Sequence, residues 1–352
     1  MAMKILNHSN VVWTVAFHPD GKHLLGGSSN GIRRWRLADG QEVGNRTGMR
    51  FNAISVSRNG KWIVCGATEG ASVWNGELDD KIIDVDRGNT VYAVDVSPDS
   101  ARFATGTNRG ASIWSITSGE RLVGPLDLDY SIIVGIRFSP PGERVATACV
   151  GHSIQIFNSN TGDKLVNIAV DIPPWVSTPL AWSSDGHQIF ATSLDKKIKS
   201  FDTSTGSLLA QSQILHDGNE NFSAIVLAAD NKFIATIASN SPTSFLDTLT
   251  LSQIGPVIED SAQPFSIAIS QDRSYLALGR QDGKIVIRDL NQITPVLSPK
   301  LPTREEVQDR QPSTSGGHDN KLPNSESVGF CHLVIKRAAL TPSLCTYNRK
   351  KL

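Results

Sequence analysis

The stretch Val12–Leu37, VWTVAFHPDGKHLLGGSSNGIRRWRL, contains three short apolar runs separated by two turns. The first run, Val12–Phe17, is rich in β-branched and aromatic residues, which favour strands. It ends at His18-Pro19-Asp20-Gly21, where Pro and Gly stand in positions typical of a tight turn. Asn30-Gly31 precedes the third run and indicates a hairpin, because both residues tolerate a positive φ. Three such strands cannot bury an apolar face alone, so this unit must stack on neighbours.

Two landmarks of this unit recur along the chain. The turn after the first run returns in segments that begin at Ser57, Ser97, Ser139, Ser183, Ala228 and Ser270. The third run carries an aromatic side chain near its end in five copies, 39 to 44 residues apart: Trp35, Trp74, Trp114, Phe157 and Phe201. A fourth short run completes most copies, and no segment shows a helical apolar period. Four-stranded units at this spacing are typical of a β-propeller.

The two ends of the repeat array complement each other. The seventh copy lacks a fourth strand, because Pro295, Pro299 and Pro302 disrupt the segment that follows it. Met3–Leu6 precedes the first copy and has no partner there. We therefore expect Met3–Leu6 to complete the seventh blade and to remove an exposed edge. The predicted fold class is all-β: a seven-bladed β-propeller of four-stranded antiparallel blades over residues 1–297, closed by the N-terminal strand.

Residues 298–352 differ in composition from the repeats. The segment is polar and rich in Ser, Pro and charge, so it cannot bury a core and is predicted to be a disordered tail. Its last part regains apolar character in VGFCHLVIKRAAL. A docking segment and the start of a further domain are therefore the alternatives that the sequence leaves open.

The repeats resemble those of a known family. VAFHPDGKHLLGGSSNGIRRWRLADG and FATGTNRGASIWSITSGERL are similar to WD40 repeats, and the resemblance covers about residues 3–295 as seven copies. It implies the propeller fold, whereas the function stays open because the family is functionally diverse. The family's buried His–Ser–Trp–Asp network is present only as fragments such as His8, Ser28 and Trp35. We therefore expect blades held mainly by apolar packing, with the sixth, around residues 239–247, the least regular.

Composition limits the function classes. Lys plus Arg and Asp plus Glu each total 34 residues, so the chain lacks the basic excess typical of proteins that bind nucleic acid or anionic membranes. No apolar run approaches the ~20 residues that span a bilayer, and MAMKILNHSN lacks a signal-peptide core. Cys65 and Cys149 lie in apolar runs and are predicted to be buried thiols. Neither nucleic acid nor membrane is expected as a partner, and the predicted location is the cytoplasm, with the nucleus as an alternative.

Catalytic signatures are absent from the sequence. There is no P-loop, GxSxG or HExxH motif. His18, His23 and His187 fall in or beside first-to-second-strand turns, which we expect to be solvated. Asp95 is the one carboxylate inside a first strand, and we expect it to be a paired structural residue. The chain is therefore predicted not to be an enzyme, with no catalytic residue, no metal ligand and no cofactor.

The loops that enter the first strands of a propeller surround one mouth of its channel. Alignment of the copies places these residues at one equivalent position: Trp13, Asn52, Tyr92, Val134, Thr178, Ser223 and Phe265. Arg50, Tyr130 and Trp175 lie just upstream in the same loops. Aromatic and Arg residues are typical interface anchors, although packing between blades is the alternative for Trp13, Tyr92 and Phe265. The candidate protein-binding residues are Trp13, Arg50, Asn52, Tyr92, Tyr130, Trp175 and Phe265.

These observations predict a non-catalytic protein-interaction scaffold that uses its propeller faces to assemble a complex. The partners would be other proteins, whose identity the sequence does not give, and the propeller would be monomeric within the complex. One alternative is a substrate-receptor or sensor module of a larger signalling or ubiquitin-ligase-type assembly. The other is a propeller enzyme with a site in the channel, which would need a cluster of carboxylates and His that the aligned first strands do not supply.

Overall fold

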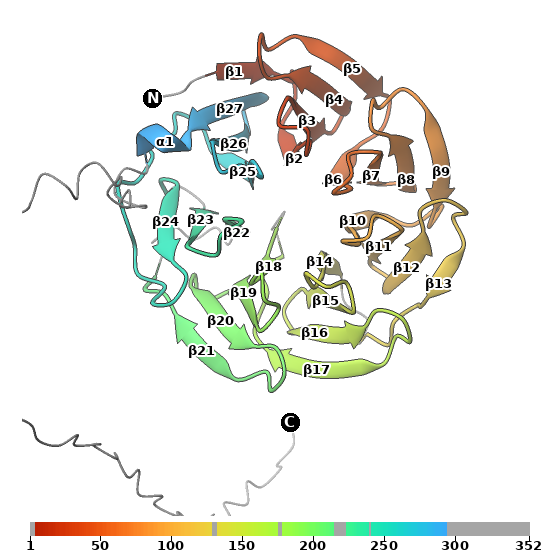
Figure 1. The fold of residues 1–352 in the computed structure, drawn as a ribbon, viewed down its shortest axis with the longest axis vertical. Coiled ribbons are helices and arrows are strands. Elements are labelled where there is room, and N and C mark those ends of the chain that lie inside the picture. The colour runs from red at the N-terminus through yellow and green to blue at the C-terminus, as the bar shows by residue number, and fades with distance from the viewer. Residues whose placement is uncertain (1–3, 129–131, 175–177, 215–222, 239–240, 294–352) are drawn as a thin grey trace, which may run out of the picture. The chain divides into compact units, whose positions relative to one another are not determined.

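Seven β-sheets lie in a ring around a central channel (Figure 1). This computed structural model describes residues 4–128, 132–174, 178–214, 223–238 and 241–293. Each sheet is one blade, the blades follow chain order, and the first strands of neighbouring blades contact one another around the channel. The predicted seven-bladed antiparallel propeller is thus confirmed, whereas the predicted tail at 298–352 lies outside the described residues. No helix in the described ranges is long and apolar enough to cross a membrane.

Each blade begins at the channel and proceeds outward. The first strands are β2 (Val12–Phe17), β6 (Phe51–Val56), β10 (Val91–Val96), β14 (Ile133–Phe138), β18 (Leu180–Trp182), β22 (Ser223–Leu227) and β25 (Pro264–Ile269). The second strands are β3 (His23–Ser28), β7 (Trp62–Ala67), β11 (Arg102–Thr107), β15 (Arg144–Cys149), β19 (Gln188–Thr192), β23 (Phe233–Ala238) and β26 (Tyr275–Arg280). The third strands are β4 (Gly31–Arg36), β8 (Gly70–Asn75), β12 (Ala111–Ser115), β16 (Ser153–Asn158), β20 (Ile198–Asp202), β24 (Ser244–Asp247) and β27 (Lys284–Asp289).

The outer edge of the ring is less uniform. The fourth strands are β5 (Glu42–Thr47), β9 (Lys81–Val85), β13 (Arg121–Val123), β17 (Lys164–Ala169), β21 (Leu208–Gln211) and, in blade seven, β1 (Lys4–Asn7). The short helix α1 (Leu290–Ile293) follows β27. Within its described residues blade six has three strands, and isolated bridges from Thr243 to Ile258 and from Leu246 to Gln253 border its outer side. Blade six is the least regular, as expected.

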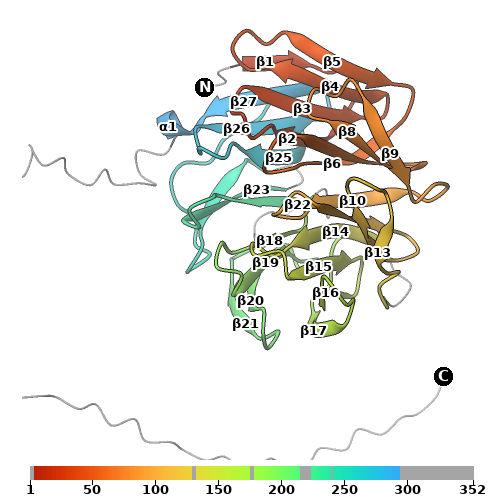
Figure 2. The ribbon, with the colours of Figure 1, turned by 45° about the vertical axis from the view of Figure 1, so that its right-hand side comes forward.

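The ring closes through the N-terminal strand. Figures 1 and 2 both show β1 beside β27, and the two strands pair antiparallel from Lys4 opposite Ile287 to Asn7 opposite Lys284. Leu6 is 2% exposed and belongs to the apolar cluster between blades seven and one. The predicted closure is confirmed for the described part of this segment, whereas Met3 lies outside the described residues.

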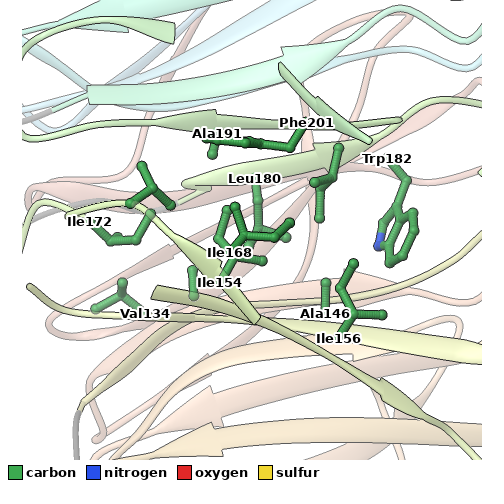
Figure 3. Packing of buried hydrophobic residues seen from close by; sticks show 13 residues of the cluster. Val134, Ala146, Ile154, Ile156, Ile168, Ile172, Leu180, Trp182, Ala191 and Phe201 are labelled. Atoms are coloured by element: carbon green, nitrogen blue, oxygen red, sulfur yellow. The ribbon is translucent and has the colours of Figure 1, made fainter. Parts of the chain in front are cut away.

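Apolar packing fills every interface between neighbouring blades. Seven clusters of buried apolar side chains occupy the seven interfaces, one cluster in each. Figure 3 shows the cluster between blades four and five, where Ile154 and Ile156 lie among the residues packed against Leu180 and Trp182. Burial of a Leu or Ile side chain stabilises a fold by about 1.5–3 kcal/mol. These interfaces therefore agree with the expectation of blades held mainly by apolar contacts.

The recurrent turn between first and second strands has a side-chain lock. Ser97 Oγ donates to Asp99 Oδ1 at 2.5 Å and accepts from the Arg102 backbone N–H at 2.9 Å. Ser183 and Ser270 make the same two bonds in their own turns. The bond from Ser183 lowers the pKa of Asp185. The Ser-x-Asp pattern therefore recurs because it rigidifies the turn at the end of the blade away from the loops that enter the first strands.

Blade three retains a buried polar network that the sequence analysis missed. Trp114 Nε1 donates to Thr105 Oγ1 at 2.9 Å, and Thr105 Oγ1 donates to Asp86 Oδ2 at 2.5 Å. These residues come from the third strand, the second strand and the loop before the first strand. Burial raises the pKa of Asp86, and the bond from Thr105 opposes that rise. The expected loss of the network is therefore wrong for blade three, where the Asp86 carboxylate accepts a hydrogen bond from the Thr105 hydroxyl.

Blade one shows what happens when the hydroxyl is missing. Gly26 stands at the position that Thr105 holds in blade three, and the His8 ring Nε2 lies 2.9 Å from the Gly26 backbone oxygen. The His8 and Trp35 rings pack edge to face with their centroids 5.5 Å apart. Ser28 instead accepts from the Asn30 backbone N–H and closes its own hairpin. The network in blade one is thus replaced by one direct bond and a ring contact.

Ring closure can be tested with two alanine variants of β1. Leu6→Ala is expected to lower the melting temperature by roughly 4–12 °C, because truncation of a buried Leu costs about 2–5 kcal/mol in a domain of this size. Ile5→Ala is the control, since Ile5 lies in the same strand and is 51% exposed, and it should shift the temperature by less than ~2 °C. Equal melting of Leu6→Ala and the parent chain by circular dichroism would contradict the closure.

The network in blade three predicts non-additive mutations. Thr105→Val keeps the side-chain shape but leaves the Trp114 indole N–H without its acceptor, so it should destabilise the fold by about 1–3 kcal/mol. In a Trp114→Phe background, where that donor is gone, the same change should cost distinctly less. Urea denaturation of the four chains measures this coupling. Additive effects of the two substitutions would show that the bond contributes nothing.

Candidate functional site

The candidate residues share a backbone feature at the start of the first strands. In blade one, Val12 pairs with Ser28 and Thr14 pairs with Gly27, so Trp13 is left between them in a β-bulge. The same break in register leaves one residue unpaired in four other blades: Asn52, Tyr92, Val134 and Phe265. A bulge re-aims the side chain that it leaves unpaired. The sequence equivalence therefore corresponds to a repeated structural device, which the sequence alone did not reveal.

Two of the seven equivalent positions lack this bulge. Thr178 precedes β18, and Ser223 pairs directly with Ala238 at the start of β22. Since first strands of all blades run in one direction, all of these positions lie at the same end of the channel. We call this end the channel mouth.

Three candidate residues form a stack that crosses three blades at the channel mouth. The rings of Phe265 in blade seven and Trp13 in blade one lie with their centroids 5.0 Å apart and inclined by 46°. The Arg50 guanidinium from the loop before blade two lies 5.0 Å from the Trp13 ring centroid. Arg50 is exposed, whereas both aromatic side chains are half-buried. Trp13 and Phe265 therefore pack between blades, which was the alternative to an exposed interface role. At the same time Trp13 supports the exposed guanidinium of Arg50.

The remaining candidates have separate surroundings. Asn52 Nδ2 donates to the Val91 backbone oxygen at 3.1 Å, so this amide ties blade two to blade three. Tyr92 is half-buried in blade three, and Val134 is buried in blade four. Tyr130 and Trp175 lie outside the described residues. The structure therefore brings Trp13, Arg50 and Phe265 into direct contact.

The central channel contains a cavity of about 990 Å³ whose wall presents polar and apolar surface in comparable measure. Charged residues contribute to the described lining at four positions: Arg58, Asp95, Arg137 and Asp185. Asp95 accepts from the Phe138 backbone N–H at 2.8 Å and from Ser55 Oγ at 3.3 Å, and it lies 3.4 Å from Arg137 Nη1. Burial raises the pKa of Asp95, and the charge of Arg137 opposes this. As expected, Asp95 is a paired structural residue, and it links three blades.

A second aromatic site lies on the outer side of the ring, and the sequence analysis did not single it out. Trp74 stands beneath Arg46 and Lys81, whose charged groups are 5.1 Å and 5.9 Å from its ring centroid. These side chains line a groove of about 460 Å³ together with residues of blades one and two. Trp74 marked the repeat in the sequence, and only the pairing of β5 and β9 with their neighbours brings the two cations onto it.

Comparisons with known proteins agree with this architecture. The family model for the WD domain, G-beta repeat, matches residues 2–36 and 81–115. Each match begins one strand before a blade and ends at its third strand, as the closure by β1 requires. The β-propeller domain of Cps50 (Swd1) from Myceliophteria thermophila superposes with a TM-score of 0.70 at 15% identity, covering 82% of this chain and 99% of that domain. The chain thus contains segments that match the WD40-repeat model, and it folds as a seven-bladed β-propeller.

Two curated relatives match smaller shares of this chain than that β-propeller domain does. Protein HIR1 of Yarrowia lipolytica is 26% identical over 196 residues, which is 52% of this chain and 17% of that protein. Eukaryotic translation initiation factor 3 subunit I of Candida albicans is 23% identical over 247 residues, 64% of this chain and 70% of that protein. The chain thus matches a small part of the first relative and most of the second. The fold by itself therefore assigns no activity to this chain, and none of these similarities points to a catalytic one.

The role assigned to Asp95 predicts a contrast between two variants. Asp95→Ala should destabilise the propeller by about 2–4 kcal/mol, because it leaves the Phe138 N–H without its acceptor and the Arg137 guanidinium without its carboxylate partner. Asp95→Asn keeps an oxygen for the Phe138 N–H and removes a buried charge, so its effect should stay below about 1.5 kcal/mol. Thermal melting at neutral pH distinguishes them, and equal losses would contradict this assignment.

Proposed function

We propose that the chain is a non-catalytic protein-interaction scaffold that holds a partner at the channel mouth through Phe265, Trp13 and Arg50. The single observation that carries this proposal is the stack of these side chains across three blades. Trp and Arg are the residue types most enriched among residues that dominate binding energy. A stack supported on three blades is also pre-organised, so a partner would not have to order it.

The stack offers a charged donor group above an apolar surface. Trp13 Nε1 is buried, so the indole presents apolar area and not its N–H to a partner. Arg50 presents its donors at the exposed end of the stack. A partner segment that places a carboxylate beside an apolar side chain fits this surface.

The channel supports the non-catalytic part of the proposal. The Asp95 carboxylate already accepts hydrogen bonds from the Phe138 backbone N–H and Ser55 Oγ and pairs with the Arg137 guanidinium. General acid–base catalysis needs a carboxyl or imidazole that can reach a substrate proton. The second relative is by name a subunit of a larger factor. By analogy, we propose that this propeller works within an assembly of proteins, in the cytoplasm or the nucleus, and without direct contact to nucleic acid or membrane.

The proposal can be tested with a double variant at the channel mouth. Arg50→Glu with Phe265→Leu should reverse the local charge and remove one ring of the stack while the fold is kept, because Arg50 is exposed and Leu retains the apolar packing of the half-buried Phe265. The measurement is affinity capture with quantitative mass spectrometry, with a melting curve for each chain. Proteins captured by the parent chain should fall at least tenfold in abundance, since loss of a central anchor costs about 1.4 kcal/mol or more.

Arg36→Ala is the matched control for this experiment. Arg36 is an exposed arginine at the other end of blade one, paired with Asp39 at 2.5 Å. Its removal should leave the captured proteins unchanged. If the double variant and the control capture the same proteins as the parent chain, the channel mouth is not the binding site and the proposal is wrong.

A further inference from the structure

The turn between β2 and β3 brings two imidazoles and a carboxylate together. His18 Nδ1 lies 3.1 Å from Asp20 Oδ2, and His23 Nδ1 lies 2.6 Å from the same oxygen. The three ligand atoms all lie within 4.8 Å of one another. The sequence-based expectation of a solvated turn is wrong for His18, whose side chain is 8% exposed. From this cluster we propose a binding site for a divalent transition metal, Zn²⁺ above all, formed by His18, Asp20 and His23.

The hydrogen bonds of His18 prepare its Nδ1 to bind a cation. His18 Nε2 lies 3.0 Å from the Gly60 backbone oxygen, which can only accept, so Nε2 carries the proton. In the neutral ring Nδ1 then has a free lone pair, and this lone pair faces an oxygen of Asp20 that is also an acceptor. The Asp20 backbone N–H approaches Nδ1 at a long 3.3 Å. Two acceptors in contact need a positive charge between them, which a proton on Nδ1 provides in the metal-free chain and a metal ion can provide in its place.

The carboxylate of Asp20 is held in place in a similar way. Its Oδ1 accepts from the backbone N–H groups of Lys22 at 2.7 Å and His23 at 3.1 Å, which leaves Oδ2 directed at the imidazoles. These bonds to Oδ1 fix the orientation of the carboxylate. Metal ligands typically have such hydrogen-bonded supports, including a backbone carbonyl behind a ligating His.

The other six turns show that this one is unusual. Where blade one has His18, the other blades have Ser or Ala. Where it has His23, the first residue of the second strand, they have Trp62, Arg102, Arg144, Gln188, Phe233 and Tyr275. A serine is therefore sufficient to close this turn, as Ser97 and Ser183 do. Neither imidazole is required by the turn, and both occur in the same copy beside a carboxylate.

The geometry suits zinc. Zn²⁺ binds imidazole nitrogen at about 2.0–2.1 Å in a tetrahedral arrangement, which places ligand atoms ~3.3 Å apart. The His18–Asp20 distance already meets this requirement, and the His23–Asp20 distance needs to widen through a small side-chain rotation. Asp20 and His23 are 30% and 18% exposed, so water can occupy the fourth position. A donor set of two nitrogens and one oxygen suits Zn²⁺ better than Mg²⁺ or Ca²⁺.

The test uses the full-length chain without an affinity tag, stripped of metal by a chelator. Titration with ZnCl₂ by calorimetry should show one equivalent bound per chain, and Co²⁺ should give visible absorption bands for a site with nitrogen ligands. At a free Zn²⁺ concentration 100-fold above Kd, the melting temperature should rise by roughly 5–10 °C. His23→Gln, which places the residue type of blade five at this position, should weaken Zn²⁺ binding at least tenfold.

Two further variants make the result specific to this site. His18→Ser restores the residue that most other blades carry and should also weaken Zn²⁺ binding at least tenfold. His187→Gln is the control, because His187 lies in the equivalent turn of blade five next to Asp185 and should leave the affinity unchanged. The proposal is overturned if the parent chain binds no Zn²⁺ at concentrations up to about 100 μM. It is equally overturned if the double variant His18→Ser/His23→Gln binds as tightly as the parent chain.

Discussion

Apolar packing between neighbouring blades is the interaction on which the rest of this propeller depends. Each sheet has two apolar faces, and each face is covered by the next blade in the ring. Seven buried clusters fill the seven interfaces, so every blade needs two neighbours. The first and last blades contact each other through β2, β25 and β26, and β1 completes this interface by pairing with β27 and adding Leu6 to its cluster. Ring closure is thus a packing requirement as much as a matter of hydrogen bonding.

Stability that resides in the interfaces permits polar motifs to vary between blades. Blade three keeps a complete chain from Trp114 through Thr105 to Asp86, whereas blade one replaces it with a bond from His8 to Gly26. The two blades differ in how far they satisfy buried polar atoms: the chain in blade three is complete, whereas His8 Nδ1 in blade one is buried without a partner among the described residues. The residue types can therefore drift away from the family pattern while the blade geometry is kept.

The sequence predicted the features that depend on local pattern and period. Strand alternation, turn residues and spacing were sufficient for the blade count and for the closure by β1. The missing features depend on contacts between segments far apart in the chain: Asp86 reaches Thr105 from a loop, and Gly60 of blade two orients His18 of blade one. The bulge at Trp13 was missed because a register break leaves no signal in a single strand. The structural equivalence of this strand position was therefore recognisable from the sequence, whereas the contacts among the side chains there were not.

The two ends of the ring carry different side-chain contacts, so the surface proposed for binding is separate from the turns that support the blades. At the channel mouth, bulges turn side chains such as Trp13 out of the ladder, and Arg50 stands exposed above it. At the opposite end, Ser–Asp turns and inter-blade bonds from Arg102 and Arg144 to backbone carbonyls fix the blades in place. His18 bonds to Gly60 in the same manner, so a metal bound there would add to the rigid end. Since β2 separates that turn from the channel mouth by its full length, metal binding would stiffen the scaffold without touching the surface proposed for the partner.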